Sequence, residues 1–448
     1  MLYSPIPDKD DEEEEVIQGR NCKLSRVVRM ICWLCLGLTT VFLLVIDKTA
    51  KAPSESGESF AFAGISPNQT RVYEDEKRIF TALINQLGIE NRSLAPFERA
   101  LLPNGCPASI QSFFQQYRQN YPKDNSNSAV ILHRPNPGSG ISDRLIHIIS
   151  LYLLAVLTNR RFLTFDEEIT RYLIPSFDIR ANRINFTAIW EIPPALDQLD
   201  HLMSPQASAS PVIAIQYMYG FTHRLIDDTR YGFGSRLKQI GFTLENVWGC
   251  TYHSLFMLRT SALLDHPDYI PILSKLLQPS KSVGIQIRRG DMYIDKGMPL
   301  PTSQNMNQFL IDSGVYRFFQ CAMELNPTYG YLMSDDNTIR EAASRLWGNG
   351  SSSPFQLLSI ILPKGVGHTH LASGQTLDGS RTTSHAFVEQ FLFSLADHHL
   401  ITTSSGYGRI AALQSLRYTE IYSWDVGSQN SACASSTFST ITREWSQI

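Results

Sequence analysis

The sequence predicts an α/β protein in which two domains built on parallel sheets follow an N-terminal transmembrane helix and a stem. Three observations support this class. Residues 129–165 show the order strand, loop, helix, strand, which is typical of a parallel sheet. A second series of the same kind begins at residue 283, and one uncharged apolar run lies near the N-terminus.

The apolar run, Met30 to Ile46, has 17 residues without a charge, which is at the short end for a spanning helix. Lys23, Arg26 and Arg29 precede it. The positive-inside rule therefore places residues 1–29 in the cytosol as a tail and the rest of the chain in a lumen. Because a short span suits the thinner early secretory membranes, we expect a single-pass type II protein of the Golgi membrane. A cleaved signal peptide is the alternative.

The luminal part begins with a stem and a helical lead-in over residues 47–125. Residues 48–68 are rich in Ser, Pro, Gly and Glu, whereas Glu74 to Leu102 carry apolar residues at helical spacing. The formal net charge of −3 argues against a nucleic-acid partner. An even number of luminal cysteines permits two disulfides, in any of three pairings, among Cys106, Cys250, Cys321 and Cys433. Sequons for N-glycans begin at Asn68, Asn91, Asn185 and Asn349.

The first α/β domain is predicted over residues 126–280. A strand over 129–132 leads into a glycine-containing loop, 134–140, and Ser142 can cap the helix that follows, 143–158. The next strand is 162–165. The helix N-terminus after such a loop can receive an anion or a sugar, although the loop lacks the third glycine of a dinucleotide fingerprint.

The second domain is predicted over residues 281–448. Its strands are expected at Val283–Ile287, Tyr329–Met333 and His399–Thr402 because these runs are short, apolar and uncharged up to their ends. Helical spacing predicts helices over 314–325, 339–347 (capped by Asn337 or Thr338), 387–395 and 407–416.

Polar residues follow all three of these strands. In a parallel sheet the carboxyl ends of the strands share one edge, and ligands bind there. The first strand is followed by Arg288 and Arg289, the second by Asp335 and Asp336, and the third by Ser404 and Ser405. Arginine offers a planar fork of donors that fits phosphate oxygens, so we expect a ligand cleft for an anionic leaving group. A solvated basic pair and an exposed Arg-Gly-Asp adhesion tripeptide are the alternatives at Arg289.

At these residues the chain resembles the GDP-fucose-dependent fucosyltransferases of the GT-B type. The resemblance covers residues 130–422 and is closest to the plant cell-wall (xyloglucan) branch and the α1,6 and Nod-factor branch. It runs through Gly138–Leu163, the strand end Gln286 to Asp291, and His385–Ala412. It implies a GT-B-like fold of two Rossmann-like domains facing a cleft. It also implies an inverting enzyme that moves L-fucose from GDP-fucose to a hydroxyl of an oligosaccharide or polysaccharide acceptor.

The resemblance also implies roles for the donor side. Arg289 would contact the donor pyrophosphate, supported by Arg288 and oriented by Asp291. Glu389 would accept hydrogen bonds from the guanine edge. The remaining donor-binding residues would be Ser404 and Ser405 on the β-phosphate, with Asp335, Asp336 and Tyr407 close to the nucleotide.

The catalytic base and the acceptor side are less defined. Asp295 lies near the position where the α1,6 branch places a glutamate, but Lys296 is closer to it. The acceptor side would be lined by Gly140, Asp143, Arg144 and His368. With arginine neutralising the leaving group, no metal or other cofactor is expected, although Ser334-Asp335-Asp336 also resembles a metal-binding pair.

Two other functions stay open. One is a related transferase that uses another nucleotide sugar, because arginine and serine contacts to a pyrophosphate do not select the sugar. The other is a non-catalytic, membrane-tethered glycan-binding protein that keeps the cleft for folding. A homodimer is left open as well.

Overall fold

The computed structural model describes residues 67–424 except for 90, 103, 122–128, 136–138, 182–189, 193–199, 201, 205–208, 217–219, 290–304, 349–352, 363–378 and 404, together with Cys433. The predicted anchor at residues 30–46 lies outside this part of the chain. Among the described helices, none has both the length and the apolar character needed to cross a bilayer.

The first sheet contains four parallel strands in the order β2 (Arg161–Thr164), β1 (Val130–His133), β5 (Val212–Ile215) and β4 (Trp190–Ile192). Helix α5 (Ile141–Leu157) connects β1 to β2 and is buried along its whole length apart from Asp143 and Arg144 in its first turn. A helix that is apolar all round needs covering on every side. The predicted strand–helix–strand unit is therefore confirmed.

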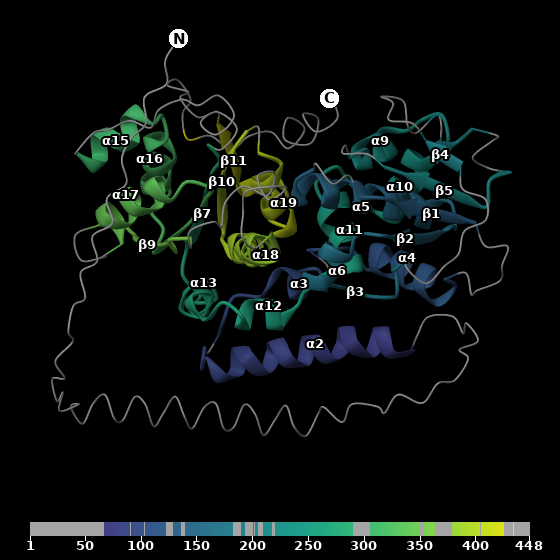
Figure 1. The fold of residues 1–448 in the computed structure, drawn as a ribbon, viewed down its shortest axis with the longest axis horizontal. Coiled ribbons are helices and arrows are strands. Elements are labelled where there is room, and N and C mark those ends of the chain that lie inside the picture. The colour runs from purple at the N-terminus through teal and green to yellow at the C-terminus, as the bar shows by residue number, and fades with distance from the viewer. Residues whose placement is uncertain are drawn as a thin grey trace, which may run out of the picture. The chain divides into compact units, whose positions relative to one another are not determined.

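The second sheet contains five parallel strands in the order β11 (Ile421–Trp424), β10 (His398–Thr402), β7 (Ser282–Ile287), β8 (Tyr329–Ser334) and β9 (Gln356–Leu358). Helices cover both of its faces (Figure 1): on one side α15 (Met306–Asp312), α16 (Tyr316–Leu325) and α17 (Asn337–Trp347), on the other α18 (Gly379–Leu395) and α19 (Gly406–Gln414).

Successive side chains of β7 point to opposite faces of the sheet, so this strand packs against the helices on both sides. Val283, Ile285 and Ile287 pack into the cluster of α15, α16 and α17. Gly284 points to the opposite face, where a Cβ would lie 2.7 Å from the ring of Phe393 in α18. A side chain at Gly284 would therefore push α18 away from the sheet. Two parallel α/β sheets are confirmed, while the boundary predicted between residues 280 and 281 stays a prediction.

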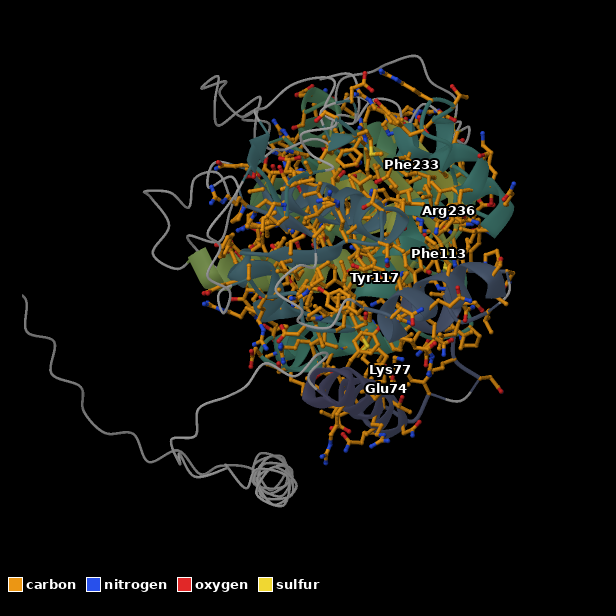
Figure 2. The ribbon with its side chains drawn as sticks, turned by 90° about the vertical axis from the view of Figure 1, so that its right-hand side faces the viewer. Glu74, Lys77, Phe113, Tyr117, Phe233 and Arg236 are labelled. Atoms are coloured by element: carbon orange, nitrogen blue, oxygen red, sulfur yellow. A yellow bond between two sulfur atoms is a disulfide. The ribbon has the colours of Figure 1, made fainter. Side chains whose placement is uncertain are left out.

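Shorter elements complete the described chain. Helix α2 (Pro67–Gln86) runs below β3 (Leu173–Pro175) in Figure 1, and Figure 2 shows it nearly along its axis, with Glu74 and Lys77 labelled on it. The carboxylate of Glu76 fixes α2 by accepting from the backbone N–H of Thr260. The remaining elements are α2 (Pro67–Gln86), α3 (Pro96–Arg99), α4 (Ala108–Gln119), α6 (Glu167–Tyr172), α9 (Thr222–Asp227), α10 (Phe233–Ile240), α11 (Val247–Leu255), α12 (Thr260–Leu264), η1 (Pro267–Tyr269), α13 (Ile270–Leu276), η3 (Tyr418–Glu420) and the antiparallel pair β3 (Leu173–Pro175) and β6 (Phe256–Leu258).

Several predicted helix ends are wrong. Gly140, not Ser142, is the N-cap of α5, and Asp336 caps α17 by accepting from Thr338 N at 2.8 Å. The pattern predicted as helical up to Leu102 breaks at Gln86, just before Gly88 with its positive φ. Caps depend on which residue adopts extended backbone, and apolar spacing does not report this.

Helix α18 begins at Gly379, eight residues before the predicted start at Phe387. Its first half carries buried polar residues, among them Thr382, Thr383 and Ser384. Because these side chains are not apolar, the helical spacing that identifies the second half does not reach them.

The two disulfides join Cys106 to Cys250 and Cys321 to Cys433. This selects one of the three pairings that the sequence permits. The first ties the segment before α4 to α11, and the second ties α16 to a residue beyond β11. Each cross-link therefore holds together segments that are more than a hundred residues apart, with separations of 144 and 112.

Replacing Cys106 and Cys250 together by serine should lower the free energy of unfolding by about 2–5 kcal/mol, because the bond closes a long loop. Denaturant unfolding followed by circular dichroism measures the loss. Peptide mapping of the non-reduced protein should recover both pairs. A peptide that links Cys106 to Cys321 or Cys433 would contradict this structure.

Candidate functional site

The three polar strand ends meet at one edge of the second sheet. β7 and β8 are paired in register up to Ile287 and Ser334, so Arg288 and Asp335 follow at the same level. β10 pairs with the other side of β7 and ends at Thr402. The sequence-based prediction that these ends share an edge is confirmed.

Arg289 is held in place by the two aspartates that follow β8. Its backbone N–H donates to Asp335 Oδ1 at 3.0 Å, and its Nη1 lies 3.3 Å from Asp336 Oδ2. The Arg289 side chain is only 1% exposed, so the charge of Asp336 stabilises a guanidinium that would otherwise be costly to bury. Asp291, the residue predicted to orient Arg289, lies outside the described residues, as does Asp295.

Gln286 and Thr402 join β7 to β10 just before this edge. The Gln286 side-chain oxygen accepts from Thr402 N at 3.1 Å, and the Thr402 hydroxyl donates to Gln286 O at 3.2 Å. The same hydroxyl accepts from Arg288 N at 3.1 Å. A Cβ on Gly408 would lie 2.3 Å from Gln286 Oε1, so only glycine lets α19 approach this closely. The Thr402 hydroxyl thereby fixes the backbone at Arg288 from the side of β10.

The N-terminus of α19 lies at the end of β10. Ser405 is fully buried and caps the helix, its hydroxyl accepting from Gly408 N at 3.2 Å. Backbone N–H groups at such a helix start attract anions. Ser404 lies outside the described residues, so its predicted contact to a β-phosphate stays a prediction.

Glu389 forms a buried bidentate ion pair with Arg340 of α17. Its two oxygens accept from Arg340 Nη1 at 2.7 Å and Nη2 at 2.9 Å, and the Arg340 side chain is 0% exposed. Arg340 also donates from Nε to Ser334 O at 2.7 Å and from Nη1 to Ile360 O at 2.9 Å. Both oxygens of Glu389 are thus bound to Arg340 inside the protein. The predicted contact of Glu389 to guanine stays a prediction.

Three buried tyrosines surround this ion pair. Burial, followed by the charge of Glu389, raises the pKa of Tyr269, Tyr331 and Tyr407 above the ordinary tyrosine value. The Tyr407 hydroxyl donates to Ala386 O at 2.6 Å, so this predicted donor-binding residue packs against α18. All three phenols therefore stay protonated at neutral pH.

On the side of the first sheet, Gly140 and Asp143 lie at the start of α5. A Cβ on Gly406 would be 3.5 Å from Asp143 Oδ1, so the two helix starts, α5 and α19, adjoin. Arg144 pairs with Asp166 at 3.1 Å and Glu168 at 2.6 Å. Glu168 in turn accepts from Thr383 of α18. His368, predicted for the acceptor side, lies outside the described residues.

Sequence reasoning missed two buried arginines near this edge, Arg340 and Arg409. Arg409 of α19 donates to Thr403 O just beyond β10. Arg340 shares a helix face with Ala343 and Trp347, which are buried. A charge on an apolar helix face needs a partner, and that signal could have identified it.

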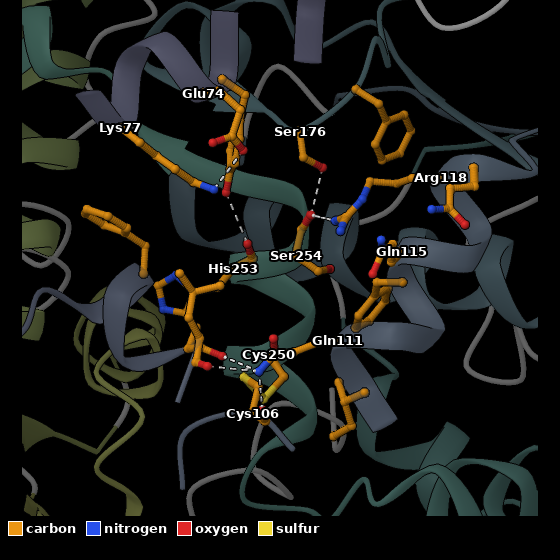
Figure 3. A pocket seen from close by; sticks show the side chains of 18 residues that line it. Glu74, Lys77, Cys106, Gln111, Gln115, Arg118, Ser176, Cys250, His253 and Ser254 are labelled. Carbon is orange, nitrogen blue, oxygen red and sulfur yellow. Dashed lines mark hydrogen bonds and ion pairs between the residues drawn. A yellow bond between two sulfur atoms is a disulfide. The ribbon is translucent and has the colours of Figure 1, made fainter. Parts of the chain in front are cut away.

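A cavity of about 500 Å³ lies elsewhere, between α2, α3, α4 and α11 (Figure 3). Its lining includes none of the residues predicted for donor or acceptor. No group of three or more His, Cys, Asp and Glu within the described ranges is arranged to hold a metal. Independence from metal stays a prediction.

Comparison of the sequence with protein-family models and with curated proteins finds no match. Among solved structures, a mutant of Arabidopsis thaliana FUT1 in complex with GDP is 15% identical, covers 71% of this chain and 76% of its own, and superposes with a TM-score of 0.45. NodZ alpha-1,6-fucosyltransferase co-crystallized with GDP is 14% identical over 64% of this chain and 92% of its own, with a TM-score of 0.39. POFUT1 in complex with GDP is 10% identical over 68% and 99%, with a TM-score of 0.31.

The chain is similar to these structures. Its own residues form an α/β protein with two parallel sheets and a buried arginine, Arg289, at the carboxyl edge of the second.

Replacing Glu389 by glutamine should lower the free energy of unfolding by about 3–5 kcal/mol, because it leaves the buried charge of Arg340 without a counter-ion. The double change Arg340→Met with Glu389→Leu should cost less than Glu389→Gln alone. Thermal and denaturant unfolding of the purified variants measure both effects.

Glu341→Gln is the matched control, because Glu341 lies on the exposed face of the same helix α17 as Arg340, with its side chain 51% exposed. Its effect on stability should stay within about 0.5 kcal/mol. Equal unfolding midpoints for Glu389→Gln and Glu341→Gln would show that the ion pair does not stabilise the fold.

Proposed function

We propose that the protein is an inverting fucosyltransferase that moves L-fucose from GDP-fucose to a hydroxyl of an oligosaccharide or polysaccharide in the Golgi lumen. It would be held there as a single-pass type II membrane protein. The observation that carries the proposal is the buried, carboxylate-held Arg289 at the carboxyl edge of a parallel sheet, beside the N-terminus of α19. The resemblance of the motifs over residues 130–422 to GDP-fucose-dependent fucosyltransferases supports GDP-fucose as the donor and L-fucose as the sugar that is transferred.

Fucosyl transfer requires that the negative charge of the leaving group is stabilised at this edge. When the bond between fucose C1 and the β-phosphate oxygen breaks, negative charge develops on GDP. Asp335 already fixes the backbone of Arg289 and Asp336 its guanidinium, so the donor needs no reorganisation at that moment, and fixed donors of this kind lower the barrier. The acceptor oxygen attacks C1 from the opposite face and loses its proton to a base. Asp295 is the proposed base.

The acceptor would approach from the side of the first sheet. Asp143 and Gly140 lie at the start of α5, adjacent to Gly406 at the start of α19. Both helix N-termini and the strand ends therefore face the same region, so donor and acceptor groups can be bound close together.

A transferase for another nucleotide sugar is the second candidate, and the Arg340–Glu389 pair favours it. If both oxygens of Glu389 stay on Arg340, that carboxylate does not select guanine. Competition between GDP and UDP separates the two candidates. Glu389→Gln adds a second readout: weaker binding of GDP but not of pyrophosphate supports guanine selection, whereas equal weakening of both supports a role in the fold.

Calorimetry on the full-length chain in detergent should detect GDP binding with no metal added, and the protein should release GDP from GDP-fucose. Both follow from an arginine that already neutralises the diphosphate. A folded sample that binds neither GDP nor UDP would overturn the proposal. Binding of GDP without turnover in the presence of glycan acceptors would support the non-catalytic glycan-binding alternative.

Arg289→Ala should reduce kcat for GDP-fucose on the order of a hundredfold or more, the typical loss for one preorganised donor. Arg289→Lys should recover activity only in part, because an ammonium lacks the planar fork. Initial rates of GDP release measure both, and circular dichroism checks the fold.

Arg345→Ala provides the control, because Arg345 is an arginine of α17 whose side chain is 66% exposed. It should leave the rate unchanged. Turnover by Arg289→Ala at the parent rate would remove the role given to this strand end.

A further inference from the structure

The cavity of about 500 Å³ has walls from four separate helices (Figure 3). Helix α2 contributes Tyr73, Glu74 and Lys77, and α4 contributes a row of glutamines and Arg118. Helix α11 contributes His253 and Ser254 near its C-terminal end, and α3 contributes Phe97. The volume falls in the range of small-molecule sites, which typically span about 300–1,000 Å³.

This cavity is separate from the strand ends that bind the proposed donor. Tyr117 and Tyr121, on and just after α4, donate to the carbonyls of Arg160 and Phe162. These two carbonyls lie at the amino end of β2, whereas the donor edge is formed by the carboxyl ends of β7, β8 and β10. No residue that lines the cavity lies at these strand ends, so a ligand in the cavity would leave the donor edge uncovered.

The walls are fixed before any ligand arrives. The Cys106–Cys250 bond joins the segment before α4 to α11. Gln111 reinforces this joint, since its amide donates to Cys106 O at 2.7 Å and to Ala100 O at 3.3 Å. A preformed site binds more tightly, because less conformational freedom is lost on binding.

Arg118 supplies a positive charge to the cavity. Its Nη1 donates to Ser254 O at 2.9 Å, which fixes the guanidinium against the C-terminal end of α11. Within the described part of the chain, no carboxylate lies within ion-pair distance of it. Lys77 and Glu74 pair with each other at 2.9 Å, and burial lowers the pKa of His253 to about 4, so this histidine is neutral. The lining thus carries one unbalanced positive charge.

Planar amides stand next to Arg118. Gln115 and Gln119 lie one turn apart on α4, are both exposed, and both line the cavity. Each amide offers two N–H donors and a carbonyl acceptor, which matches the adjacent hydroxyls of a sugar ring. An arginine fork beside such amides matches a carboxylate next to hydroxyls.

We propose that this cavity is a second saccharide site, which takes a sugar residue that carries a carboxylate. The carboxylate pairs with Arg118, and the ring hydroxyls bond to Gln115 and Gln119. This site does not depend on the proposed transferase activity, because it shares no residue with the donor edge.

Binding of trigalacturonate to the full-length chain, measured by calorimetry and by saturation-transfer NMR, tests the proposal. We expect saturable binding, with maltotriose, an uncharged trisaccharide, at least about tenfold weaker because it lacks the charged partner. GDP should not displace trigalacturonate. Arg118→Gln and Gln115→Ala should each weaken binding on the order of tenfold, as expected for lost hydrogen bonds to a charged group or a bound hydroxyl.

Gln116→Ala is the matched control: Gln116 is exposed on α4 directly beside Gln115 but does not line the cavity. It should leave the affinity unchanged. Gln115→Ala removes an exposed amide, so it keeps the test valid should Arg118→Gln unfold. The proposal is overturned by absence of trigalacturonate binding to folded protein, by equal affinity for maltotriose, by displacement with GDP, or by a Gln115→Ala variant that binds like the Gln116→Ala control.

Discussion

The buried ion pair of Arg340 and Glu389 is the interaction on which the proposed donor edge, at the carboxyl ends of β7, β8 and β10, depends. Two charges inside a protein are tolerated only when geometry and further hydrogen bonds compensate their desolvation. Arg340 meets this condition with two bonds to Glu389 and others to the carbonyls of Ser334 and Ile360. It therefore connects α17, the last residue of β8, the segment after β9 and α18.

The ion pair of Arg340 and Glu389 also positions Arg289, through a short series of hydrogen bonds. Arg340 donates to the Ser334 carbonyl and so fixes the backbone at the end of β8. This determines where the next two residues, Asp335 and Asp336, lie. Asp335 fixes the backbone of Arg289, and Asp336 fixes its guanidinium while also capping α17. The arginine that is proposed to bind the diphosphate is thus positioned by carboxylates that are themselves positioned by a second, buried arginine.

Much of the architecture could be predicted from the sequence, because strands of a parallel sheet are short apolar runs with polar residues at their ends. Val283–Ile287 and Tyr329–Met333 were identifiable for this reason, and so was the common edge of Arg289 and Asp336. Helix ends were not, since a cap such as Gly140 depends on backbone conformation that apolar spacing does not encode.

The sequence also does not predict which polar residues or cysteines bind to one another. Glu389 and Arg340 are 49 positions apart, and only the fold brings them together. The partner of Cys106 was one of several cysteines until the fold placed Cys250 beside it. The cavity at α4 gave no signal either, because Gln115 and Arg118 look like any exposed helix face.

Hydrogen–deuterium exchange of the full-length chain with and without GDP, in the absence of metal, tests the location of the donor site most directly. We expect GDP to slow amide exchange in residues 288–289, 335–338 and 405–408, the ends of β7 and β8 and the start of α19, and to leave exchange in residues 108–119 of α4 unchanged. Protection by GDP in α4 alone, or unchanged exchange at all three strand ends in a sample that binds GDP, would contradict it.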